Sequence, residues 1–242
     1  KIRPRVEVFE FDSSKGMIPV VPRATASLAA EGASLADIAI SGAVAPFDTV
    51  KVAALTTVER DDLEDYPFVD GALSDALAGA IGERIDVTLV AGGTDGENTV
   101  SGFVDVGVTT APTGSLALAD VLSAVARVTD AGGTANAVFM SAQGKAAFLA
   151  ANAGKLAGLD LPEIVAIGKL DDGTAALDDT SFVVADLSKV AVALRKKVSV
   201  SMHYGEDALF AVDGVGLVGT ARVSGVSVAN AGHVQVVTGT AV

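Results

Sequence analysis

The most regular apolar pattern in the chain lies within residues 67–91. Apolar side chains recur there in steps of four, at Val69, Leu73, Leu77, Ile81, Ile85 and Leu89. A step of four exceeds one helical turn by about 40°, so the stripe winds around the helix instead of facing one partner. Gly79 and Gly82 are tolerable within this stretch, and Gly92 and Gly93 follow it. The pattern predicts a helix about 35 Å long that contacts several neighbouring elements.

The residues before this helix predict a strand and then an acidic helix start. Residues 49–55 are apolar and β-branched, as in a short strand. Acidic side chains follow, where a helix N-terminus favours negative charge and side-chain caps; they are Asp61, Asp62, Glu64 and Asp65. Pro67 fits a first turn, because its missing N–H would have no partner there. We therefore expect the acidic residues to form the start of the long helix.

The first part of the chain has no helical period. Residues 1–16 combine a basic, proline-containing start with alternating apolar positions, which predicts an arm with one strand. The chain begins at Lys1 without an initiator methionine, so we expect it to be trimmed or proteolytically matured. Residues 17–54 are interrupted by prolines and glycines and contain no bulky aromatic residue before Phe47. Such a loop cannot build its own core, and long loops usually carry function or pack on a partner.

The second half of the chain alternates helices and strands and then continues as strands. Between residues 111 and 199 we expect a helix from residues 113–115 to Gly132, a strand at 136–140, a helix capped by Ser141 with Phe148 and Leu149 inward, and strands at 164–167 and 182–185. The tail predicts further strands at 191–194, 198–202, 208–212, 215–223 and 233–239. The expected class is α+β with a mixed sheet.

Composition and charge exclude several classes of protein. Ala and Val make up most of the 50% hydrophobic residues, and no apolar run is long enough to span a membrane. Without cysteine the chain has no disulfide and no thiolate nucleophile. The net charge is −13, and the only run of consecutive basic residues is the cluster of Arg195, Lys196 and Lys197. We interpret this cluster as a solvated edge or turn, because binding to DNA phosphates requires several spaced cations.

No residue is assigned a catalytic, cofactor-binding or metal-binding role. The two histidines, His203 and His233, lie in strand-like runs and are expected to be half-exposed and hydrogen-bonded. Residues 92–96 follow a helix and fit a helix cap and turn, not a phosphate-binding loop. Residues 213–219 precede β-branched positions, so a strand is favoured over a dinucleotide-binding helix. The acidic pairs at 171–172 and 178–179 lack the EF-hand spacing and fit solvated turns.

The order of these parts resembles the HK97-fold major capsid proteins of tailed phages. A loop with Glu31 and Gly32 precedes the strand at 49–55, the acidic start and the long helix. Downstream, residues 182–200 resemble the family's strand pair leading out of one domain, and residues 208–228 resemble its final strand. The similarity covers nearly the whole chain. The family's apolar Gly-x-Pro-Val segment is not clear near residues 158–168, and the short chain implies few inserted domains.

The resemblance implies an HK97-like capsid fold with five parts. These are an N-terminal arm at 1–16, an extended β-hairpin loop at 17–54, a peripheral domain at 55–110 with the spine helix at 67–91, a mixed α/β axial domain at 111–199, and C-terminal strands at 200–242 that return to the peripheral domain. Some relatives cross-link subunits through a loop lysine. Lys15 and Lys51 lie at the margins of the loop, but no cross-link is assigned.

The resemblance also implies the function and the partners. It implies a non-enzymatic capsid subunit of the virion, assembled in the host cytoplasm as pentamers and hexamers of an icosahedral shell. The shell would enclose double-stranded DNA without sequence-specific binding, with scaffolding and portal proteins and a possible decoration protein as partners. Two alternatives stay open: an encapsulin-like nanocompartment shell that encloses protein cargo, or a small α/β enzyme or ligand-binding domain using residues 111–199.

Overall fold

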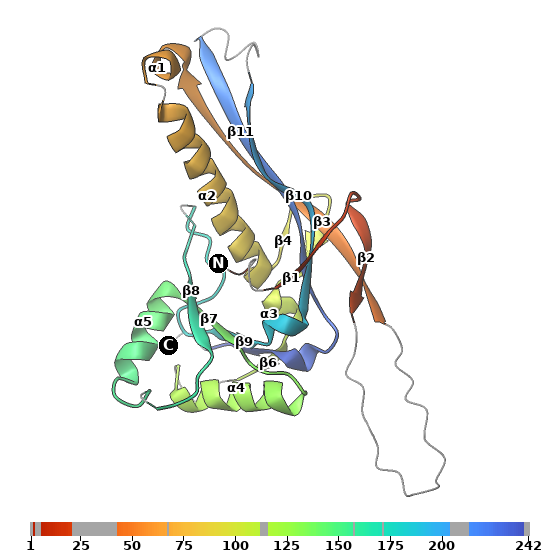
Figure 1. Cartoon of the computed structure of the whole chain (residues 1–242). Coiled ribbons are helices and arrows are strands. Elements are labelled where there is room, and N and C mark those ends of the chain that lie inside the picture. The colour runs from red at the N-terminus through yellow and green to blue at the C-terminus, as the bar shows by residue number, and fades with distance from the viewer. Residues whose placement is uncertain are drawn as a thin grey trace, which may run out of the picture.

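The computed structural model describes residues 2, 6–20, 43–66, 68–111, 116–156, 158–170, 172–203 and 213–239. The described chain forms two five-stranded sheets, with a long helix beside one and two shorter helices beside the other (Figure 1). This mixture of helices and strands confirms the predicted α+β class.

The first sheet has the strand order β1-β10-β11-β3-β2. Its strands are β1 (Glu7–Glu10), β2 (Lys15–Val20), β3 (Ala43–Glu59), β10 (Val190–His203) and β11 (Gly214–Val228). β3 and β11 pair antiparallel in unbroken register over residues 49–59 of β3. Only residues 11–14 join the edge strands β1 and β2, so the sheet must curl to bring its edges together. Phe11 and Phe47, with ring centroids 4.7 Å apart, pack in the small apolar cluster that results.

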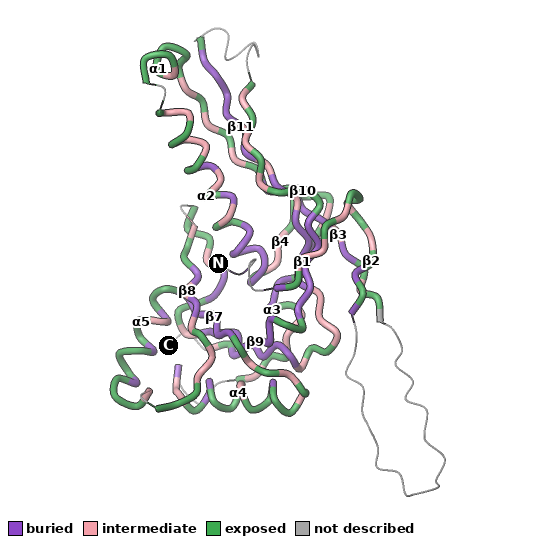
Figure 2. Tube along the Cα trace, in the orientation of Figure 1, coloured by how far each residue is buried: buried purple, intermediate pink, exposed green. Residues whose placement is uncertain are grey.

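Helix α2 (Phe68–Ala91) packs on this sheet in contact with β11, β3 and β10. Gly219 of β11 permits the close approach, because a Cβ there would lie 2.6 Å from Cδ1 of Ile81. Residues 85–90 are buried on all sides, whereas no residue before Leu77 is fully buried, as Figure 2 shows. The helix ends at Gly92, whose φ of 77° a glycine adopts without strain. The predicted long helix and its glycine stop are confirmed.

The second sheet has the order β6-β12-β9-β7-β8 and carries helices α4 and α5. Its elements are β6 (Val108–Thr110), α4 (Leu118–Asp130), β7 (Ala137–Ser141), α5 (Ala142–Ala151), β8 (Glu163–Ile167), β9 (Phe182–Ala185) and β12 (Val234–Val237). The remaining elements are the two-stranded sheet of β4 (Gly93–Thr94) and β5 (Thr99–Val100), helix α3 (Phe103–Val106) and the short helices η2 (Leu187–Lys189) and η3 (Ala231–His233). Ser141 caps α5 by accepting the N–H of Gly144, as predicted.

One apolar core connects the two sheets. A single cluster includes Ile85 of α2, Val50 of β3 and Phe139 of β7. Phe139 stacks on Phe103 of α3 with ring centroids 5.3 Å apart. A second cluster lies beneath α4 and α5 and includes Phe148. Because β7, β9 and β12 are buried along their whole length, the second sheet has apolar partners on both faces.

The acidic segment forms a helix of its own, which corrects the expected helix start. Residues 61–65 belong to α1 (Arg60–Asp65), which is followed by its C-cap residue Tyr66, and only Asp70 is acidic in the first turn of α2. Tyr66 leaves the helical conformation at φ −127° and ψ 78°, which separates the two helices. Pro67 lies outside the described residues.

Three further expectations are corrected by the pairing of the strands. β12 lies in the second sheet between β6 and β9, not with the other C-terminal strands. The runs at 191–194 and 198–202 form one strand, β10, which shifts register near Arg195 instead of turning. β3 and β10 run straight through the expected domain boundaries at residues 54 and 199. The strand expected at 208–212 and the helix start at 113–115 lie outside the described residues.

Leu149 does not face inward as expected, because it is 39% exposed while Phe148 is fully buried. Consecutive helical residues point about 100° apart, so a narrow buried face admits only one of the two. Gly144, four residues before Phe148, is buried on the same face.

We expect Gly102→Ala to destabilise the subunit by about 1–3 kcal/mol. A Cβ at Gly102 would overlap the backbone nitrogen of Gly92 and the backbone oxygen of Val90, and backbone atoms cannot move aside without disturbing the end of α2. The control is Gly79→Ala, whose Cβ meets nothing within 4 Å on α2. It should stabilise the helix by about 0.5–1 kcal/mol. Urea unfolding of the two variants would show opposite signs, and equal shifts would contradict this packing.

Candidate functional site

The end of the molecule farthest from the second sheet carries two exposed aromatic side chains. Tyr66 follows α1 and is 52% exposed, and Phe68 begins α2 and is 73% exposed. Their rings meet edge to face with centroids 5.9 Å apart, at the end of the molecule where α1 is drawn in Figure 1. Exposed aromatic surface marks binding sites more often than it occurs by chance. We call Tyr66 and Phe68 the aromatic tip.

Acidic side chains precede the aromatic tip on α1. Residues 61, 62, 64 and 65 of α1 are acidic and exposed. Arg60 is the basic residue of α1, and its Nη2 lies 3.6 Å from Oδ1 of Asp213, at the start of β11. An apolar centre with a charged rim is the usual anatomy of a protein–protein interface. The tip therefore has the properties of a contact surface for another protein.

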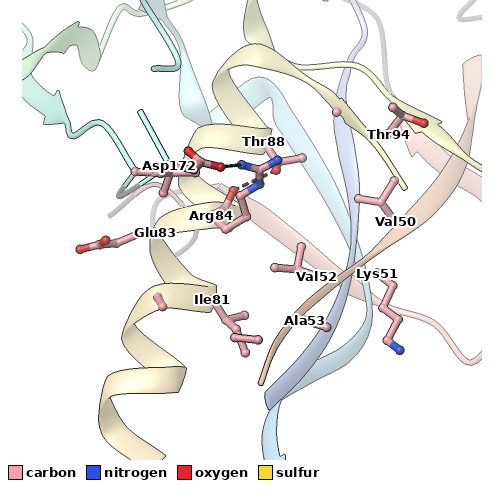
Figure 3. A pocket seen from close by; sticks show the side chains of 14 residues that line it. Val50, Lys51, Val52, Ala53, Ile81, Glu83, Arg84, Thr88, Thr94 and Asp172 are labelled. Atoms are coloured by element: carbon pink, nitrogen blue, oxygen red, sulfur yellow. Dashed lines mark hydrogen bonds and ion pairs between the residues drawn. The ribbon is translucent and has the colours of Figure 1, made fainter. Parts of the chain in front are cut away.

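A groove of about 460 Å³ lies between β3 and α2. Figure 3 shows β3 on one side and α2 on the other, with Arg84 and Asp172 at one end. The apolar part of its lining includes Val50, Val52, Ala54 and Ile81. The charged side chains of its lining are Lys51, Glu83, Arg84 and Asp172, and the last two form an ion pair with each other.

Asp172 ties the loop between β8 and β9 to α2. Its Oδ2 lies 3.3 Å from Nη1 of Arg84, and its Oδ1 accepts the N–H of Thr174 at 2.8 Å. Hydrogen bonds from Thr174, and then the positive charge of Arg84, lower the pKa of the Asp172 carboxyl. Both side chains of the ion pair are largely exposed, so the pair orients the loop more than it stabilises the fold.

Asp95 connects the β4–β5 turn to β3. Its Oδ1 accepts the N–H groups of Asn98 and Glu97, at 2.8 and 3.1 Å, and its Oδ2 accepts the N–H of Lys51 at 3.1 Å. The bond from Asn98 is the largest cause that lowers the pKa of the Asp95 carboxyl, and the bond from Lys51 is the next. One carboxylate thus holds the turn closed and covers an outward-facing amide of β3.

We expect Asp95→Asn to weaken the pH dependence of stability in acid. Because the pKa of Asp95 is lower in the folded state, its contribution is present above the unfolded-state pKa of about 4 and is lost as pH falls through the folded value. Asparagine has no such charge to lose. Thermal unfolding at pH 5 and pH 3 should show a smaller drop for Asp95→Asn than for wild type. An equal drop would contradict the role of this carboxylate.

The structure does not bring the two histidines together. His203 is exposed at the end of β10, where its Nε2 lies 3.1 Å from Oγ of Ser201. His233 is only 3% exposed in η3, and neither ring nitrogen has a hydrogen-bond partner among the described residues. The expectation of a half-exposed, hydrogen-bonded residue is wrong for His233, because η3 packs against α4.

The other candidate segments have structural roles where the structure describes them. Residues 92–96 form the end of α2 and the β4 turn, and residues 214–219 lie in β11, as predicted. Asp172 and residues 178–179 are exposed, and Asp179 accepts the hydroxyl of Ser141 at 2.7 Å. Across the described ranges, no group of three or more acidic or histidine side chains is placed to hold a metal ion.

The basic cluster is exposed, and its side chains have partners within the subunit. Arg195 Nε donates to the backbone oxygen of Asp12 at 3.1 Å, Lys196 Nζ donates to Oγ1 of Thr220 at 2.7 Å, and Lys197 Nζ lies 2.7 Å from Glu10. These contacts join β10 to its neighbours on the sheet. These contacts within the subunit account for the three basic side chains without a nucleic-acid partner.

Helices in the described ranges are all too short or too polar to cross a lipid bilayer.

Sequence reasoning missed the aromatic tip and the groove beside β3. Tyr66 and Phe68 are two of only eleven Tyr and Phe residues in the chain, nine Phe and two Tyr, and their position next to an acidic run was the available signal. No local signal indicates the groove, because it depends on how α2 lies across the sheet.

Several solved structures with a similar fold come from phages and from a GTA particle. The sequence profile of the phage capsid family matches residues 1–237. A solved structure from Mycobacterium phage Bobi is 16% identical, with a TM-score of 0.71 over 100% of this chain and 90% of that one. One from Gordonia phage Cozz is 14% identical, with a TM-score of 0.71 over 100% of this chain and 86% of that one. The capsid of an empty GTA particle is 15% identical, with a TM-score of 0.72 over 99% of this chain and 89% of that one.

A search of curated protein sequences gives no match. At these sequence identities the solved structures support only the fold. The family to which the chain is assigned rests on the sequence profile, which spans nearly the whole chain. The chain belongs to the phage capsid family.

Proposed function

We propose that copies of this structural capsid protein assemble as pentamers and hexamers into a closed icosahedral shell that encloses double-stranded DNA. The observation that carries the proposal is the family match over residues 1–237. The exposed aromatic tip and the groove beside β3 support it, because both are surfaces that a single copy leaves open. Repeated weak contacts in closed symmetry add up to a stable shell.

In the proposed assembly, each of the two sheets forms the centre of one domain. The peripheral domain would comprise α2 with β3, β10 and β11, and the axial domain would comprise the second sheet with α4 and α5. The axial domain would meet its copies around the five-fold and six-fold centres. Residues 1–16 would act as an arm, and the segment between β2 and β3 would extend over a neighbouring subunit.

The remaining parts of the proposal concern chemistry and partners. The subunit would carry out no catalysis and would hold DNA by enclosure, without sequence-specific contacts. The net charge of −13 supports enclosure over tight binding, because an acidic wall repels phosphates. Assembly would take place in the host cytoplasm, with scaffolding and portal proteins as transient partners and a decoration protein as an optional one.

The contents of native particles test the enclosure of DNA. Particles purified from the producing cells would be treated with nuclease, opened, and analysed for nucleic acid and for protein other than the shell subunit. We expect nuclease-protected double-stranded DNA of uniform length. A lumen filled by one protein and free of DNA would contradict the proposal and would favour a nanocompartment.

A further inference from the structure

One edge of β3 is covered along only part of its length. β11 covers the other edge throughout residues 49–59. On the open side β2 pairs with residues 43–48, Ser14 accepts the N–H of Thr49 at 2.9 Å, and Asp95 accepts the N–H of Lys51 at 3.1 Å. Beyond Lys51, no strand of the described chain pairs with this edge.

The backbone direction shows which groups the open edge presents. The N–H groups of Thr49 and Lys51 point away from β11, whereas the N–H of Arg60 reaches Asp213 on the β11 side. The register between β3 and β11 is unbroken over this stretch. Because N–H and C=O groups alternate sides along a strand, those of residues 53, 55 and 57 point to the open side.

This edge lacks the protection that the edge strands β2 and β1 carry. The backbone of Ser14 faces β3. Because backbone groups alternate sides along a strand, Pro19 lies with its missing N–H on the outer side of β2. A proline in this position commonly blocks the pairing of a further strand. β1 has Glu7 and Glu10 at its ends. Residues 52–58 of β3 read VAALTTV, without a charge or a proline. In a protein that stays monomeric, such an edge promotes aggregation.

The open edge leads into the groove between β3 and α2. Residues 50–54 of β3 line one side of this groove, and Ala80, Ile81, Glu83 and Arg84 of α2 line the other (Figure 3). A strand added to β3 would lie about 4.8 Å from it. Residues 53 and 54 belong both to this edge and to the groove lining, so the added strand would meet the groove at one end.

We propose that an extended segment of a second copy of this chain adds to the open edge of β3 over residues 53–57, as a sixth strand of the sheet. This inference rests on the proposed assembly and names one contact within it. A second copy is the fitting partner because capsid structures are built of many copies, so the edge meets another subunit at high local concentration. Leu55, 69% exposed next to the open edge, adds apolar area to the contact.

Hydrogen–deuterium exchange at single-residue resolution tests the pairing in the wild-type protein. In dissociated subunits the amides of residues 53, 55 and 57 should exchange rapidly, while those of 52, 54 and 56 are protected by β11. In shells the first set should slow by about a hundredfold or more. Unchanged rapid exchange in intact shells would overturn the inference and leave the proposed assembly standing. Failure to form shells would instead overturn the proposed assembly, and this contact with it.

A proline variant tests the same edge through assembly. Ala53→Pro removes only an outward N–H, and Val52 before it stays in the extended conformation that a following proline favours. We expect a folded subunit with an assembly yield at least about tenfold lower. Ala53→Ser keeps the N–H and should assemble normally, whereas Ala54→Pro removes a bond to β11 and should destabilise the subunit itself. Normal shells from Ala53→Pro would overturn the inference.

Discussion

Phe139→Ala is expected to lower the free energy of unfolding of the subunit by about 3–5 kcal/mol. Phe139 is fully buried in β7 and stacks on Phe103 of α3 at 5.3 Å, inside the cluster that connects the two sheets. Removing its ring leaves a cavity in the apolar core that the two sheets share. Because a domain is stable by only about 5–15 kcal/mol, this single change brings the subunit close to unfolding. Urea unfolding of unassembled subunits, followed by circular dichroism, measures the loss.

Phe68→Ala is the matched control for this prediction. Phe68 is 73% exposed at the aromatic tip, so its truncation should change the unfolding free energy by less than about 0.5 kcal/mol. A loss below about 1 kcal/mol for Phe139→Ala would show that the two sheets do not share one core.

Replacing residues 21–42 with Asn-Gly is expected to abolish shell assembly and to leave the subunit folded. β2 and β3 pair as far as Val20 and Ala43, so a two-residue turn of this type closes the hairpin without disturbing the ladder. The removed segment contains no aromatic residue and cannot form a core by itself. Its proposed role is contact with a neighbouring subunit, which the short turn cannot reach.

Electron microscopy measures the loss of shell assembly, and thermal unfolding measures whether the subunit stays folded. The variant should keep the circular dichroism spectrum and melting temperature of the wild-type subunit while forming no closed particles. Normal particles would remove the role proposed for the segment. An unfolded variant would instead show that the segment supports the subunit itself.

Local patterns in the sequence predicted the elements better than their pairing. Helix α2 could be predicted from the four-residue spacing through Ile81 and Ile85 and from the glycines after Ala91. The start of α5 could be predicted from Ser141 alone. The acidic run was equally compatible with the start of α2 and with a separate α1, because both place negative charge at a helix N-terminus. Only the backbone at Tyr66 distinguishes the two.

Long-range pairing and surface geometry could not be predicted from local patterns. β12 is apolar and buried on both faces, and such a strand fits any interior position of either sheet. His233 looked half-exposed because it stands beside an alternating run, yet η3 buries it against α4. The open edge of β3 depends on where β2 ends and on the carboxylate of Asp95, which lies 44 residues away from Lys51 in sequence.

The central claim is that this chain builds a shell from copies of itself. Negative-stain microscopy of the purified chain, together with light scattering across a broad range of protein and salt concentrations, tests the claim most directly. The account predicts closed particles of uniform diameter, formed above a threshold concentration. A monomer or dimer that persists under all these conditions would contradict it.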